Sequence, residues 1–235
     1  MQVFDYDKTQ VSSDTTELER KHLDSEEELE DLLNANPEML LDETVLIFSR
    51  QPSLEPGLPD LVALDQYGNV IVFELKKGFS GTGSASEETI LSQPQNYARA
   101  LAPFDYDDLN DLYQEYVRQI EEDEINVDGS ALQGDELDEA FEAVFGQTLR
   151  PSQYNEKQRM VILAETITGQ TTENALYLQE QGLNVQCQET QIFETEEGDR
   201  IVANSIVVDY DNRRVRPKRG SGNPAHKEEN EEILR

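Results

Sequence analysis

The chain has 235 residues, of which 50 are acidic and 19 are basic, so its formal net charge is -31. The length suits one domain with a core of ordinary size. No apolar run approaches the roughly 18 residues that span a bilayer, and the N-terminal residues lack the basic and apolar regions of a secretory signal. A single cysteine, Cys187, excludes an internal disulfide and disfavours a thiolate zinc site. We therefore expect a cytoplasmic protein without a membrane partner.

The excess of acidic residues has two interpretations. Taken alone, it argues against a nucleic-acid partner, because phosphates would be repelled. In a halophilic cytosol, however, molar salt shortens the Debye length to about 3 Å and screens this repulsion. The acids are scattered over every segment and lysines are few, which favours the halophilic interpretation. The alternative is an acidic mimic of DNA, so the net charge does not identify the partner.

The sequence pattern of the N-terminal quarter predicts an arm, a helix and a short strand. Residues 1–16 are polar and aperiodic, and we expect them to form a flexible arm. Ser25 and Glu28 form a predicted capping box at the start of a helix that stops at Pro37. A strand is expected over 45–48, followed by a stretch rich in turn residues.

The clearest local signal is a β-hairpin. Two β-rich runs, 60–64 and 70–76, flank a loop of sequence DQYGN that is typical of a hairpin turn. A loop centred on Tyr67 places Asp60 opposite Glu74, and alternation puts Lys76 on the same face. The opposite face is wholly apolar, which fixes the register, because a slip of one residue would bury the charges. That apolar face consists of Leu61, Ala63, Ile71, Phe73 and Leu75.

The remainder predicts alternating helices and strands that complete one α/β domain over residues 17–210. A Gly/Ser-rich loop is expected over 78–86, and a strand–helix–strand order later in the chain predicts a right-handed crossover onto the same sheet. Beyond Tyr210 we expect a polar, partly basic tail over 211–235. The expected helices cover 93–101, 107–122, 135–145 and a segment from Thr171 or Thr172 to Gly182, and the expected strands cover 159–164, 185–189, 191–195 and 200–208.

The predicted pairing of Asp60 with Glu74 indicates a site. Two carboxylates directly opposite on one sheet face, with Cβ atoms about 4.5–5.5 Å apart, repel each other unless a cation lies between them. Oxygen ligands suit a hard divalent ion, Mg²⁺ or Mn²⁺, which keeps several waters and binds phosphate. Lys76 projects from the same face and can hold a water or a phosphate oxygen. The alternative is an exposed, salt-bridged surface, since Glu-x-Lys alone is very common.

The pattern Asp60…Glu74-Leu75-Lys76 resembles the PD-(D/E)XK nuclease superfamily. More closely, the segments SEEELEDLLNANPEML, LIFSRQPSLEPGLPDLVALDQYGNVIVFELKKG, SQPQNYARAL and RMVILAETITGQTTENALYLQEQGLNVQ are similar to the nuclease domain of the NucS/EndoMS type and its stand-alone relatives. These segments cover most of residues 25–195. The resemblance implies a restriction-endonuclease-like fold, with a mixed central sheet flanked by helices.

The resemblance also implies a metal site. Asp60 and Glu74 would be ligands of Mg²⁺ or Mn²⁺, helped by the backbone carbonyl of Leu75. Glu26 would be the acid of the first helix that completes the metal shell, directly or through water. Glu30 lies one turn further along the same helix face and could take that role instead. For Glu26 the alternative is a favourable interaction with the helix dipole.

Further residues match the family around this site. Lys76 would position or activate the attacking water. Gln93 and Tyr97 match a Gln-x-x-x-Tyr pair on the helix after the hairpin, where Gln93 would orient the lysine or contact phosphate. Tyr97 would pack or hydrogen-bond beside it, with a core role as the alternative. Pro94 departs from the family pattern and favours a helix start or a kink.

Two basic residues are expected to contact DNA, Arg50 and Lys77, with a surface ion pair as the alternative for Arg50. The basic cluster over 213–219 could contact phosphates or simply balance the acidic body. His22 and His226 have no partner pattern, and we expect both at the surface.

These residues predict a metal-dependent endonuclease acting on DNA, in repair or defence. The alternative is an acidic, non-catalytic interaction protein that mimics DNA or has lost catalysis on a nuclease scaffold. A third reading is a nuclease that cuts RNA or DNA only with a partner protein. The sequence leaves the oligomeric state open, whether a homodimer or a complex with such a partner.

Overall fold

The predicted hairpin lies in the middle of a mixed sheet. A computed structural model of the protein describes residues 4–5, 16–81, 89–122, 124–125 and 134–210. Within them a seven-stranded sheet has the order β3-β8-β7-β6-β5-β4, and β9 pairs with β8 off this path. The strands are β3 (Glu19–Lys21), β4 (Leu46–Arg50), β5 (Leu61–Leu64), β6 (Val70–Phe79), β7 (Gln158–Thr166), β8 (Val185–Glu194) and β9 (Arg200–Val208).

The hairpin register is the predicted one. Leu64 pairs with Val70 and Leu61 with Phe73 in the antiparallel β5–β6 ladder. Gly68 occupies the turn with a φ of 78°, a conformation that suits glycine. One face of the hairpin is wholly apolar and the other carries the charges of Glu74 and Lys76, so a slip of one residue would bury those charges.

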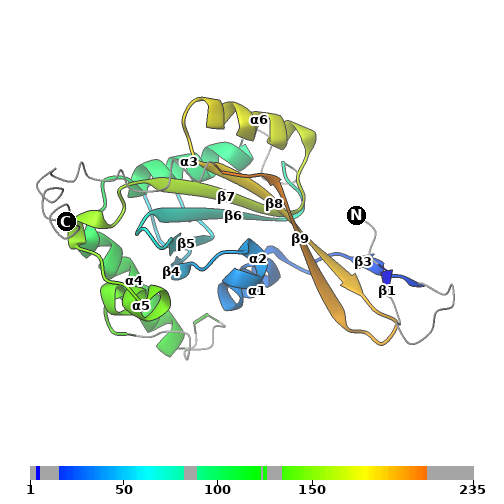
Figure 1. Ribbon diagram of the computed structural model, residues 1–235, viewed down its shortest axis with the longest axis horizontal. Coiled ribbons are helices and arrows are strands. Elements are labelled where there is room, and N and C mark those ends of the chain that lie inside the picture. Colours follow the sequence, from blue (N-terminus) through cyan, green and yellow to red (C-terminus); the bar gives the residue numbers. More distant parts are fainter. Residues whose placement is uncertain (1–3, 6–15, 82–88, 123, 126–133, 211–235) are drawn as a thin grey trace, which may run out of the picture.

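Helices cover both faces of the sheet (Figure 1). A separate apolar core lies between the sheet and the helices on each face. On one face, Leu29 packs with Phe73 and Leu75. On the other face, Ile90 packs with Val72. The predicted fold class, an α/β domain with a mixed central sheet flanked by helices, is confirmed. The helices are α1 (Glu26–Ala35), α2 (Pro37–Leu41), α3 (Thr89–Leu101), α4 (Tyr106–Glu121), α5 (Leu137–Phe145) and α6 (Gly169–Glu180).

The start of α1 differs in detail from the predicted capping box. The Ser25 side chain accepts a hydrogen bond from the Glu28 amide at 3.1 Å, as expected of an N-cap. The Glu28 carboxylate, however, accepts from the amide of Asp24 at 2.7 Å rather than from Ser25. Pro37 ends α1 but also begins α2, because proline is favoured in the first turn of a helix.

Pro94 lies inside α3, which begins at Thr89, so the expected helix start at 93 was wrong. Proline removes one main-chain hydrogen bond in that helix, and the apolar residues Ile90 and Leu91 hold the preceding turn against the core. Gln93 and Tyr97 therefore share one continuous helix and, at a spacing of four residues, one face of it.

The C-terminal half contains the expected crossover. β7 and β8 are parallel neighbours joined by α6, whose N-cap is Thr168 rather than Thr171 or Thr172. The two strands predicted at 185–189 and 191–195 are one strand, β8, which extends past the main sheet to pair with β3 and β9 (Figure 1). Their polar residues obscured this continuity.

The predicted arm over 1–16 lies mostly outside the described residues, although β1 (Phe4–Asp5) pairs with β2 (Thr16–Glu17) in a separate small ladder. The tail over 211–235, with its basic cluster and His226, and most of the Gly/Ser-rich loop also lie outside them. Among the helices that the structure describes, none has the length and apolar character needed to cross a bilayer.

Candidate active site

The structure brings Asp60, Glu74 and Lys76 together near the end of the hairpin. Glu74 and Lys76 belong to β6, whereas Asp60 precedes β5 by one residue and so lies just outside the ladder. Its carboxylate turns back onto β6, where Oδ2 accepts the amide hydrogen of Leu75 at 2.6 Å. This hydrogen bond holds Asp60 beside Glu74 without a strand pair.

Burial, with repulsion by neighbouring acids, raises the pKa values of Asp60 and Glu74. Glu74 is only 4% exposed. Burial and the negative charge of Glu74 raise the pKa of Asp60 to about 8, although the Leu75 amide opposes the shift. Burial also raises the pKa of Glu74 to about 7, against the attraction of Lys76. The sheet therefore holds two carboxyl groups that resist ionising together at neutral pH.

Lys76 is surrounded by acids. Its Nζ lies 3.5 Å from Glu74 Oε1 and 3.3 Å from Glu26 Oε2, and its side chain is 12% exposed. Burial lowers the pKa of Lys76, but the charges of Glu74, Glu26 and Asp60 outweigh burial and raise it. The ammonium group therefore stays protonated, so Lys76 acts as a positive charge and a hydrogen-bond donor rather than as a base.

The two candidate acids of the first helix have different environments. Glu26 is half exposed and contacts Lys76. Glu30 is buried, forms an ion pair with Arg50 Nε at 3.0 Å and accepts from Gln51 Nε2 at 3.1 Å. The negative charge of Glu30 also raises the pKa of Asp60, which places it within electrostatic reach of the acid pair. The structure thus brings both glutamates to the site, through different neighbours.

Arg50 lies in the interior and not at the surface. Its side chain is 7% exposed and also binds Asp31, with Nη1 2.6 Å from Oδ1. This geometry favours an ion pair over a phosphate contact for Arg50. The ion pair is buried, however, whereas the alternative placed it at the surface. The network of Arg50, Glu30 and Gln51 could not be predicted from the sequence, because nothing in the local pattern indicates that β4 and α1 meet.

Tyr97 packs against the turn that leads to Asp60. A Cβ atom on Gly57, whose φ is 139°, would lie 3.1 Å from the Tyr97 hydroxyl oxygen. Burial and the charges of Glu74 and Asp60 raise the pKa of Tyr97, so its ring is close to both acids. Gln93 Oε1 is buried and has no hydrogen-bond partner among the described residues. Both members of the predicted Gln-x-x-x-Tyr pair therefore lie on the helix that borders the site.

The side chains of Lys77 and His22 bind other groups than the acid pair. Lys77 follows Lys76 on β6 and is exposed, and its Nζ donates to the main-chain oxygen of Asp24 at 2.7 Å. His22 is exposed as expected, but it does have a partner, since Nδ1 lies 3.1 Å from the buried carboxylate of Glu165. That contact joins residues 143 positions apart and has no signature in the local sequence.

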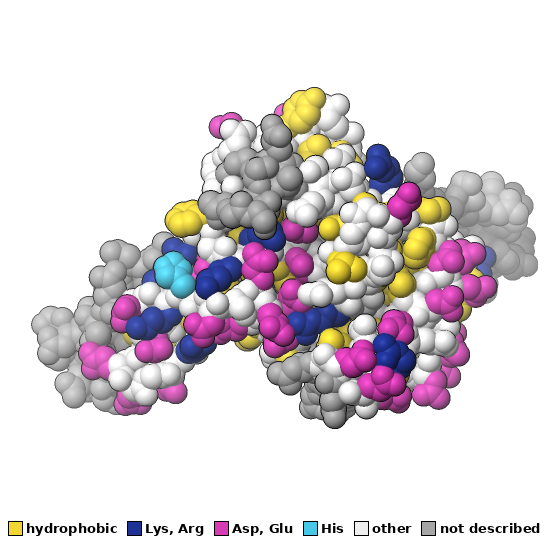
Figure 2. All heavy atoms as spheres, turned by 180° about the vertical axis from the view of Figure 1, so that it is seen from behind, with side chains coloured by type: hydrophobic (Ala, Val, Ile, Leu, Met, Phe, Trp, Pro, Cys, Tyr) yellow, Lys and Arg dark blue, Asp and Glu magenta, His cyan; other side chains and the backbone are white. Residues whose placement is uncertain are grey.

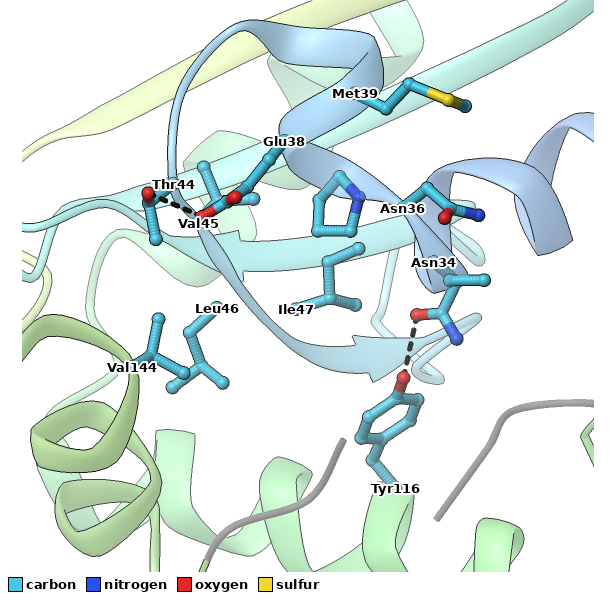
Figure 3. A pocket seen from close by; sticks show the side chains of 12 residues that line it. Asn34, Asn36, Glu38, Met39, Thr44, Val45, Leu46, Ile47, Tyr116 and Val144 are labelled. Atoms are coloured by element: carbon cyan, nitrogen blue, oxygen red, sulfur yellow. Dashed lines mark hydrogen bonds between the residues drawn. The ribbon is translucent and has the colours of Figure 1, made fainter. Parts of the chain in front are cut away.

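Two hollows in the described structure lie away from the acid pair. A cavity of about 490 Å³ lies beside α2 and β4, and Figure 3 shows Glu38 bonded to Thr44 and Tyr116 bonded to Asn34 at its wall. A larger groove of about 760 Å³ is lined by Pro56 and by residues of α3 and the turn after it. Neither contains Asp60, Glu74 or Lys76 in its lining, so neither of these two hollows is the site of the acid pair.

The donor set suits one hard divalent ion. No group of three or more His, Cys, Asp or Glu side chains is placed for a metal in the described part of the chain. The partly buried Asp60 and the buried Glu74 nevertheless supply two carboxylates, whose pKa values are raised mainly by burial. Two such ligands suit Mg²⁺ or Mn²⁺, which fill their remaining positions with water and phosphate oxygens. The residues therefore fit a metal bound mainly by one acid pair.

Comparison with known proteins found likenesses among solved structures only. No family model and no curated protein matches the chain. It is similar to a repair endonuclease from Pyrococcus abyssi, with a TM-score of 0.38 and 18% identity over 70% of this chain and 47% of the other. It is also similar to EndoMS in a complex with double-stranded DNA, with a TM-score of 0.32 and 18% identity over 70% of this chain and 44% of the other. The chain thus spans less than half the length of these proteins, which are of the NucS/EndoMS type.

Proposed function

We propose that this protein is a metal-dependent endonuclease that hydrolyses DNA phosphodiester bonds. One observation carries the proposal: the fold holds the partly buried Asp60 next to the buried Glu74, at a cost in stability, beside a protonated lysine. A sequence under selection for stability alone would replace one of these acids. The arrangement is explained if a divalent ion and a phosphate use the three charges.

The metal would be held by Asp60 and Glu74, with the carbonyl of Leu75 as a third oxygen ligand. When bound, it would supply an acidified water and neutralise charge on the phosphate. Ionised carboxylates are required for this role, and the opposing charge of the metal would favour their ionised forms.

Lys76 would stabilise the negative charge that develops on the phosphoryl oxygens. Its ammonium group is fixed between Glu74 and Glu26, so its position is set before the substrate arrives. Preorganised positive charge in a site with little water is an effective form of transition-state stabilisation. Glu26 would tether Lys76 and, being half exposed, could also receive a metal-bound water.

Glu30 and Arg50 would position Asp60. The main-chain oxygen of Asp60 accepts the Gln51 amide at 3.0 Å, and the Gln51 side chain binds Glu30. Arg50 in turn forms an ion pair with Glu30, so Glu74 is the acid whose charge acts most strongly on Asp60. We assign these residues a structural role in the site.

A non-catalytic acidic interaction protein remains the second candidate. The observation that favours it is that Lys76 is already neutralised by Glu26 and Glu74, and that no third acid joins Asp60 and Glu74 at one point in the described structure. An inactive scaffold would bind no divalent ion at this site, whereas a nuclease requires one.

The test is a cleavage assay with supercoiled, single-stranded, branched and mismatched DNA, run with Mg²⁺ or Mn²⁺ over a series of KCl concentrations. We expect Lys76→Ala to abolish cleavage while its thermal unfolding stays cooperative. The matched control is Arg150→Ala, an exposed basic residue near the opposite end of the hairpin. Cleavage by Lys76→Ala at the wild-type rate would refute the proposed mechanism.

A further inference from the structure

Two exposed basic residues near the candidate site are held by neutral groups. Arg20 Nη2 donates to the main-chain oxygen of Glu165 and to Thr166 Oγ1, each at 2.9 Å. Lys77 Nζ donates to the main-chain oxygen of Asp24. Neither forms an ion pair with a carboxylate in the described residues, although acids outnumber bases 50 to 19 in this chain. These hydrogen bonds hold both side chains in place, and no carboxylate of the described residues pairs with either charge.

A buried carboxylate brings these two residues together. Glu165 is 1% exposed, and its oxygens accept from the amide of Leu23 at 3.1 Å and from the amide of Gly78 at 2.6 Å. It therefore joins the segment that carries Arg20 to the end of β6 that carries Lys77. His22 binds the same carboxylate, and its side chain is 68% exposed.

The pair lies directly beside the candidate site. The segment over 24–26 contacts both lysines of β6, since Lys77 binds the Asp24 carbonyl and Lys76 binds Glu26. Figure 2 shows several Lys and Arg side chains gathered around the histidine on this face, at the base of the projecting arm. Asp and Glu side chains lie between and beside these basic ones in the same view.

Two of the nearby acids are paired with other lysines. Glu19 binds Lys21, with oxygen and nitrogen 2.8 Å apart, and Glu26 binds Lys76. The Glu165 carboxylate is enclosed by main-chain amides and His22. Asp24 is exposed, but its contact with Lys77 is made by its carbonyl group. Arg20 and Lys77 thus present two positive charges that no described carboxylate pairs directly, on a molecule that is otherwise strongly acidic.

We propose that Arg20 and Lys77 contact backbone phosphates of the nucleic acid next to the scissile bond, an inference that rests on the proposed nuclease function. Phosphate contacts of this kind position a strand without reading its bases. They would let a molecule of net charge -31 engage DNA at one place, with the strand passing from the Arg20–Lys77 surface towards Lys76.

The test measures the salt dependence of binding with fluorescently labelled DNA, single-stranded and duplex, in EDTA so that cleavage plays no part. The variants are Arg20→Gln, Lys77→Gln and the double variant, with Arg150→Gln as the control. Each lost phosphate contact lowers the slope of log K against log salt by about 0.9 for duplex and about 0.7 for single strands. We expect the slope of the double variant to fall by about 1.8 on duplex DNA and by about 1.4 on single-stranded DNA. The control should keep the wild-type slope.

An unchanged slope in a double variant whose thermal unfolding matches the wild type would overturn the proposed contacts, as would a wild type that binds neither DNA. The cleavage assay is read separately. If the double variant loses slope but the wild type cuts nothing with Mn²⁺, the phosphate contacts stand and the nuclease function falls. If the wild type cuts DNA and the double variant keeps its slope, the nuclease function stands and the proposed phosphate contacts fall.

Discussion

Asp60 and Glu74 are held in a state that isolated side chains would avoid. Their pKa values, about 8 and about 7, lie well above the ordinary range of carboxyl groups because burial penalises their charged forms. Near neutral pH the metal-free protein therefore either keeps protons on this pair or bears the repulsion. Both outcomes make the pair sensitive to pH and to divalent ions.

This sensitivity predicts how stability depends on pH. Between about pH 4 and about pH 8, folded Asp60 holds a proton that the unfolded chain releases, so the unfolding free energy falls as pH rises through this range. Asp60→Asn removes this contribution. In urea unfolding with EDTA, we expect the variant to gain stability over the wild type at about pH 8 but not at about pH 4. Parallel pH profiles for the two proteins would contradict the raised pKa.

The buried Arg50–Glu30 pair makes a second prediction. Arg50→Met leaves Glu30 charged and buried without its partner, which costs about 3–5 kcal/mol of unfolding free energy. Adding Glu30→Gln should recover a large part of that loss, because the uncompensated charge is gone. A double-mutant cycle by urea denaturation measures the coupling. Additive losses would show that the two side chains do not interact as described.

At the scale of elements, the hairpin and the turn before it determine the site. Gly57 has a φ of 139° and approaches the Tyr97 hydroxyl, whereas Gly198 has a φ of 89° with no atom near its missing side chain. Both Gly→Ala changes strain the backbone, but only Gly57→Ala also displaces Tyr97 and the turn that leads to Asp60. We expect Gly57→Ala to lower the cleavage rate and Gly198→Ala to leave it unchanged. Equal rates would argue against a role for the turn.

Local pattern predicts a strand and its register well where one face is wholly apolar and the other carries charges. The β5–β6 register followed from alternation alone, and so did the placement of Glu74 and Lys76 on one face. The position of Asp60 just outside the ladder did not, since it depends on a hydrogen bond to Leu75. β3 was missed, because its three polar residues show no apolar alternation. Contacts between distant segments, such as Glu30 with Arg50, have no local signature.

At the scale of the whole molecule, the charge of -31 opposes compaction. Salt near 1 M reduces the range of this repulsion to about 3 Å. We therefore expect the thermal midpoint to rise steeply between about 0.1 M and about 2 M KCl. An uncharged osmolyte such as sucrose, at equal osmolality, controls for effects other than screening. A midpoint that does not depend on KCl would contradict the halophilic interpretation.

Calorimetric titration with Mn²⁺ tests the central claim most directly. We predict that the wild type binds one ion, and that Asp60→Asn and Glu74→Gln each abolish binding while remaining folded. Asp31→Asn, which alters an acid outside the pair, should bind as the wild type does. Absence of Mn²⁺ binding by the folded wild type, or its retention by both variants of the pair, would show that these buried acids do not form a metal site.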